Sequence, residues 1–103
     1  MKEYNKLIRD RIPEIIEDAG KDYELETVEG DDYQKALEEK LQEEVNEYRT
    51  ENNIEELADI MEVIDSLLAC HGTTREELEK LRKEKKQERG GFERGLFLLR
   101  AEE

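Results

Sequence analysis

Apolar side chains recur at helical spacing in this chain, and that spacing constrains its fold more than any other feature. One series runs along residues 31–49, and a second runs along residues 53–71. A helix with one apolar stripe must bury that stripe against another element. The first stripe comprises Tyr33, Leu37, Leu41, Val45 and Tyr48, and the second comprises Leu57, Ile60, Met61, Ile64, Leu67 and Leu68.

Capping residues, glycines and a proline divide the chain into helices, which we predict over about residues 9–19, 31–49, 53–71 and 74–89. The signals are Pro13 and Gly20 for the first helix, Asp31 or Asp32 for the second, Asn52 or Asn53 and Gly72 for the third, and Thr74, Glu77 and Gly90 for the fourth. Because the turn between the second and third helices is short, these two must lie antiparallel.

Two further segments have the composition of strands. In residues 23–28, Tyr23, Leu25 and Thr27 alternate with Glu24, Glu26 and Val28, and residues 92–99 include the apolar run Leu96 to Leu99. We expect them to pair as a small β-hairpin. The predicted fold class is therefore all-α, an antiparallel helical bundle with this hairpin added, in a single domain over residues 1–103.

The charge of the chain bears on its partners and its assembly. Charged residues make up 46% of the sequence and apolar residues 35%, so one copy has a thin core, which favours a homodimer or homotetramer. The net charge of −13 would repel a nucleic acid polymer. The single cysteine, the absence of a signal-like start and the absence of a long apolar run predict a cytoplasmic protein without membrane association.

Acidic side chains are concentrated on the predicted hairpin. Glu44 and Glu47 share a face of the second helix, and Glu56 and Asp59 lie three residues apart on the third. Winding at 100° per residue places Glu44 inside the apolar stripe, with Glu47 and Glu56 at the stripe edges. Asp59 lies further round its helix, toward a different helix or a second subunit. Converging carboxylates of this kind suit Mg²⁺ or Mn²⁺.

Spacing alone leaves two interpretations open. Acidic residues are so frequent that chance produces about eight acidic pairs at a spacing of three residues in a chain of this composition. A bundle with acidic edges therefore explains the pattern as well as a metal site does.

The same residues resemble a known family. The series Glu43-Glu44-x-x-Glu47 followed by Glu56-x-x-Asp59, within EELADIMEVID, is similar to the signature of the MazG-like all-α nucleotide pyrophosphohydrolases. The opening YNKLIRDRIPEII and the closing RKEKKQERGGFERGLFL resemble its phosphoribosyl-ATP pyrophosphohydrolase-like subgroup. Only eight residues separate Glu47 from Glu56, fewer than in many members of that family.

The resemblance implies an Mg²⁺-dependent enzyme, with Mn²⁺ as a substitute, that cleaves a nucleoside triphosphate between its α and β phosphates and releases pyrophosphate. It assigns Glu44, Glu47, Glu56 and Asp59 as metal ligands. It assigns Glu43 either as a group that supports those ligands or as a catalytic base that helps to orient the attacking water. It also implies a role in removing surplus or modified nucleotides.

Basic residues near both ends of the chain are candidates for binding substrate. The resemblance favours Lys6, Arg9 and Asp10 as nucleotide contacts; the alternative is that these basic groups pair with surface carboxylates. Lys83, Lys86 and Arg89 recur every three residues, and they either bind phosphate or complement a helix dipole.

Two rival functions accompany the pyrophosphohydrolase hypothesis. One is a phosphoribosyl-ATP pyrophosphohydrolase of histidine biosynthesis. The other is a non-catalytic helical assembly module that retains the acidic pattern. All four ligand positions are acidic in this chain, which disfavours the module.

Overall fold

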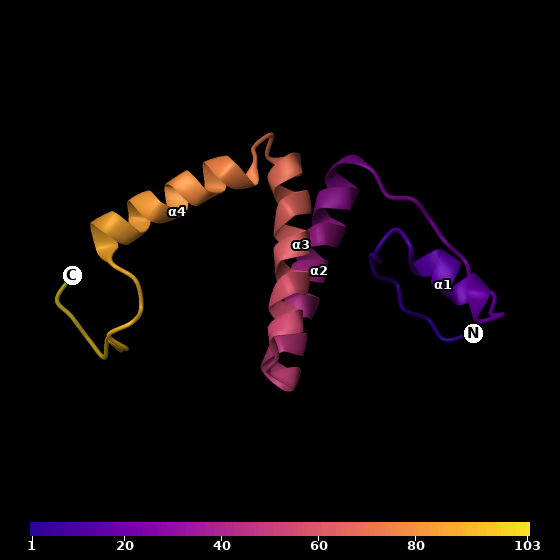
Figure 1. Cartoon of the computed structure of the whole chain (residues 1–103), viewed down its shortest axis with the longest axis horizontal. Coiled ribbons are helices and arrows are strands. Elements are labelled where there is room, and N and C mark those ends of the chain that lie inside the picture. The colour runs from indigo at the N-terminus through magenta and orange to yellow at the C-terminus, as the bar shows by residue number, and fades with distance from the viewer. The chain divides into compact units, whose positions relative to one another are not determined.

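The computed structural model describes residues 1–103, and its regular elements are all α-helices (Figure 1). Its helices are α1 (Ile12–Asp18), α2 (Gly30–Glu51), α3 (Ile54–Cys70) and α4 (Arg75–Arg89). The predicted all-α class is confirmed. The chain divides into two compact units, Met1–Gly72 and Thr73–Glu103, and each is described by itself.

The centre of the first unit is an antiparallel hairpin of α2 and α3, which lie side by side (Figure 1). Asn52 ends α2 in the left-handed conformation, with φ of 57° and ψ of 40°. Asn53 then caps α3, because its side-chain oxygen accepts a hydrogen bond from the Glu56 backbone N–H at 3.2 Å. Two adjacent asparagines thus reverse the chain within one turn.

The core of this hairpin is small. Its buried apolar side chains are Leu37 of α2 and Val63 of α3, and Glu44 of α2 is buried beside them. Several apolar residues of α3 stay exposed, among them Ile54, Leu57 and Met61. One copy of the chain therefore buries little apolar surface, as its composition predicts.

The N-terminal part of the first unit is mostly irregular. α1 is shorter than predicted: it begins at Ile12, where Pro13 lies in the first turn, and ends before Gly20, whose φ is 73°. Residues 1–11 form no helix or strand. They reach the α2–α3 hairpin through side-chain contacts at its acidic surface.

The second unit consists of α4 and the tail that follows it. Thr74 caps α4 by accepting a hydrogen bond from the Glu77 backbone N–H at 3.2 Å, which confirms the capping position. The helix ends at Arg89, and Gly90 follows it with a φ of 84°, a left-handed value that suits glycine.

The predicted β-hairpin is wrong. Neither residues 23–28 nor residues 92–99 form a strand. A two-stranded ribbon is marginally stable in water unless a further element covers its apolar side. Here no such element covers the segments, and Leu25 and Phe97 stay 58% and 87% exposed. Tyr23 instead donates a hydrogen bond to the Glu17 carboxylate of α1.

We also find that no helix combines the length and apolar character needed to cross a bilayer.

Candidate metal centre

Three carboxylates from α2 and α3 converge on the hairpin. One ligating oxygen from each of Glu44, Glu56 and Asp59 lies within 4.8 Å of the other two. Residues three apart share a face of a helix, so Glu56 and Asp59 lie on the same face of α3. Because the turn between the helices is short, this face lies against the α2 face that carries Glu44, and the three carboxylates converge. Asp59 was expected to face a different helix or another subunit, but it faces the cluster formed by Glu44 and Glu56.

Glu47, the fourth predicted ligand, lies outside this three-residue group. It lines an open groove of the hairpin together with Glu43 and Glu56. Its negative charge is close enough to Glu56 to raise the pKa of that carboxyl group. Glu47 therefore borders the cluster from the α2 side.

Two oxygens in the cluster are buried and have no hydrogen-bond partner. They are Oε2 of Glu44, a residue that is 7% exposed, and Oε2 of Glu56. Buried carboxylate oxygens normally find a hydrogen bond or a cation, because removing them from water is costly. A divalent cation between the helices would satisfy both oxygens, so the residues present fit a metal with oxygen ligands.

The local electrostatics favour a cation. Burial raises the pKa of Glu56, and the neighbouring charges of Glu47, Asp59 and Glu44 raise it further. Like charges held close together disfavour ionisation unless positive charge compensates them. A bound Mg²⁺ or Mn²⁺ would supply that compensation.

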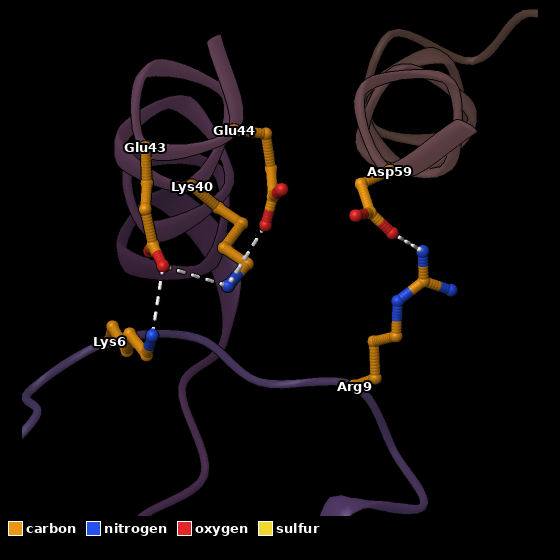
Figure 2. A network of polar contacts seen from close by, with 6 residues as sticks. All are labelled: Lys6, Arg9, Lys40, Glu43, Glu44 and Asp59. Carbon is orange, nitrogen blue, oxygen red and sulfur yellow. Dashed lines mark hydrogen bonds and ion pairs between the residues drawn. The ribbon is translucent and has the colours of Figure 1, made fainter. Parts of the chain in front are cut away.

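Basic side chains pair with acids of the cluster and with the neighbouring Glu43 (Figure 2). Lys6 Nζ lies 2.9 Å from Glu43 Oε1, and Arg9 Nη2 lies 2.7 Å from Asp59 Oδ1. Figure 2 shows that both basic residues come from the irregular N-terminal segment, while the acids come from two different helices. The predicted substrate contacts Lys6 and Arg9 are therefore paired with acids of the candidate site.

Glu43 is held ionised by its surroundings. Partial burial alone would raise its pKa, but the hydrogen bond from Lys6 and the positive charge of Lys40 outweigh that effect and lower it. The same hydrogen bond raises the pKa of Lys6. Glu43 is not one of the three converging carboxylates.

The remaining predicted substrate contacts are placed differently. Asp10 lines a cavity of the first unit that also reaches Arg9, Glu44 and Asp59. Lys83, Lys86 and Arg89 lie on α4 in the second unit. There Lys86 Nζ lies 3.6 Å from Glu93 Oε1, and phosphate binding by these three residues stays a prediction.

Sequence reasoning missed Lys40. Its ammonium group lies 3.4 Å from Glu43 Oε1 and 3.3 Å from Glu44 Oε1. The spacing of three and four residues along one helix was a usable signal, because such residues are neighbours on the helix surface.

Searches of protein-family models, of curated proteins and of solved structures find no match to this chain.

Proposed function

We propose that this chain is an Mg²⁺-dependent nucleotide pyrophosphohydrolase of the MazG-like all-α type, cleaving a nucleoside triphosphate to the monophosphate and pyrophosphate. The observation that carries the proposal is the pair of buried, unpartnered oxygens on Glu44 and Glu56, beside Asp59. Oxygen ligands without partners are what a divalent cation requires.

The metal ligands in this proposal are Glu44, Glu56 and Asp59, with Glu47 as a fourth acid at the border of the site. When bound, Mg²⁺ supplies positive charge that offsets the charge developing on the transferred phosphate oxygens. Mn²⁺ has similar ligand preferences and would substitute for it.

Glu43 orients the attacking water in this mechanism. Because its pKa is lowered, Glu43 is ionised at neutral pH and is a weak base. It therefore accepts a hydrogen bond from the water and aligns it, while Lys6 and Lys40 hold the carboxylate in place. Arg9 stands at the same surface, where its guanidinium group can turn from Asp59 to a substrate phosphate.

The proposal includes assembly as a homodimer or homotetramer in the cytoplasm, where the enzyme would remove surplus or modified nucleotides. Assembly is supported by α3, which carries apolar residues on two sides. Val63 packs toward α2, whereas Ile54, Leu57 and Met61 remain exposed. At 100° per residue, Met61 and Val63 lie about 200° apart.

The test is a pyrophosphate-release assay over common and modified nucleotides and phosphoribosyl-ATP, with and without Mg²⁺. We expect Mg²⁺-dependent release from at least one nucleoside triphosphate. Glu56→Gln should reduce the rate by about 10²- to 10³-fold, since it removes a ligand of the cation that would stabilise charge on the reacting phosphate. Glu55→Gln is the matched control, because Glu55 precedes it on α3 and lies outside the cluster.

The outcomes separate the rival functions. Activity on phosphoribosyl-ATP alone would assign the chain to histidine biosynthesis. No release from any substrate by a folded chain would overturn the enzymatic proposal and leave the assembly module.

A further inference from the structure

Lys40 lies between two acids of the candidate site on α2. Its Nζ atom contacts Glu43 Oε1 at 3.4 Å and Glu44 Oε1 at 3.3 Å (Figure 2). The Lys40 side chain is only 15% exposed, so its aliphatic stem is packed and its ammonium group has little freedom to move.

The two carboxylate oxygens of Glu44 have different surroundings. Oε1 faces Lys40, and Oε2 is buried without a partner. The last torsion of a glutamate side chain has a broad energy minimum, so the plane of its carboxylate needs an external contact to fix it. The ion pair with Lys40 is such a contact.

We propose that Lys40 is a positioning residue of the metal site, which holds Oε1 of Glu44 so that Oε2 is the oxygen presented to the cation. This inference rests on the metal site of the proposed function. It adds a residue that the acidic signature does not contain.

Charge and positioning predict opposite effects for Lys40. Its ammonium group is positive and close to the cluster, so by Coulomb repulsion alone its removal would strengthen cation binding. If Lys40 positions Glu44, its removal weakens cation binding, because the carboxylate is then free to rotate. Whether cation binding becomes stronger or weaker when Lys40 is replaced therefore distinguishes charge repulsion from positioning.

The experiment measures cation affinity without nucleotide, using calorimetry for Mg²⁺ and the electron paramagnetic resonance signal of free Mn²⁺. Lys40→Met keeps the aliphatic stem and removes the donor; we expect the Kd to rise about 10- to 100-fold, as for other groups that orient metal ligands. Lys40→Arg restores a charged donor and should recover most of the affinity. Lys35→Met is the matched control: Lys35 is an exposed residue of α2, and losing it should change the Kd by about twofold or less.

A double-mutant cycle tests whether Lys40 acts through Glu44. In a Glu44→Gln background, Lys40→Met should have little further effect on the Kd, because the carboxylate that Lys40 holds is already gone. Additive effects of the two substitutions would overturn the proposal. If the circular dichroism of Lys40→Met shows a loss of helix, Lys40→Gln is used in its place. Its shorter, uncharged amide should also weaken cation binding.

Failure of this inference differs from failure of the proposed function. Binding by Lys40→Met that equals or exceeds wild type would overturn the role of Lys40 and leave the metal site standing. Absence of Mg²⁺ and Mn²⁺ binding at millimolar concentration in the wild-type chain would overturn both.

Discussion

Arg9 Nη2 donates a hydrogen bond to Asp59 Oδ1 at 2.7 Å, although 50 residues of chain separate them. Together with the contact between Lys6 and Glu43, this bond holds the irregular N-terminal segment against both helices of the hairpin. The segment therefore carries positive charges that pair with Asp59 of the metal cluster and with the neighbouring Glu43.

Replacing Arg9 should affect cation and nucleotide in opposite directions. Arg9→Gln removes the counter-ion of Asp59, so Mg²⁺ should bind about two- to five-fold more tightly, a change of the size expected for an exposed ion pair. The KM for the nucleotide should rise, because a phosphate contact is lost. Calorimetry and steady-state kinetics measure the two effects.

The control for that variant is Arg11→Gln. Arg11 pairs locally with Glu14 at 3.2 Å, so its loss should leave both quantities near wild type. Weaker Mg²⁺ binding in Arg9→Gln would contradict the competition between Arg9 and the cation.

The raised pKa of Glu56 predicts how pH acts on stability. Folding raises the pKa of the Glu56 carboxyl group above its ordinary value of 4.5. The stability that comes from this shift is fully present below pH 4.5, and it is lost as pH rises through the pKa that Glu56 has in the folded chain. In the presence of a chelator, the Glu56 contribution should therefore decline as pH rises above about 4.5. Mg²⁺ binds the ionised form, so the increase in Tm that Mg²⁺ produces should grow over the same range.

Thermal melts in chelator and in Mg²⁺ across this pH range measure both trends. Glu56→Gln cannot ionise at this position, and it should flatten the pH dependence in chelator. A Mg²⁺ effect on Tm that grows as pH falls would show that protonated carboxyls do not exclude the cation.

Tyr23 should ionise at higher pH than an ordinary tyrosine. The hydrogen bond to Glu17 raises the pKa of Tyr23 above its usual value of 10.0. The stability that this bond contributes is present below pH 10.0 and is lost as pH rises through the folded pKa. A titration of tyrosinate absorbance, compared with Tyr23→Phe, should assign the late transition to Tyr23.

In that titration, Glu17→Gln should shift the transition toward an ordinary value. Glu14→Gln removes a nearby carboxylate of α1 that pairs with Arg11, and it should leave the transition in place. A Tyr23 transition that Glu17→Gln does not move would exclude the bond in solution.

The exposed apolar side of α3 predicts which substitutions disrupt assembly. Met61 is 41% exposed on that side, and Met61→Glu should lower the molar mass measured by sedimentation or light scattering, because it places a charge in an apolar contact. Cys70→Glu adds the same charge at an exposed position about 180° away on α3 and should leave the mass unchanged. A monomeric wild-type chain would contradict this assembly directly.

The predicted cap of α2 at Asp31 or Asp32 is wrong, because α2 begins at Gly30 and no side chain caps it. The starts of α3 and α4 were predictable because the interactions that set them are local. Asn53 and Thr74 each accept a hydrogen bond from a backbone N–H three residues ahead, so the signal lies within one turn of sequence. The same local spacing placed Glu44 on the buried face of α2 and paired Glu56 with Asp59.

The contacts between elements were decided by tertiary structure. Residues 23–28 have a strand-like alternation, yet no neighbouring strand is present to complete a ladder. The rotation of α3 against α2 brings Asp59 into the cluster and leaves Glu47 at its border. The pairing of Arg9 with Asp59 joins positions 50 residues apart. Periodicity within a helix determines which residues share a face, but the face that a helix presents to its neighbour depends on how side chains from distant parts of the chain pack together.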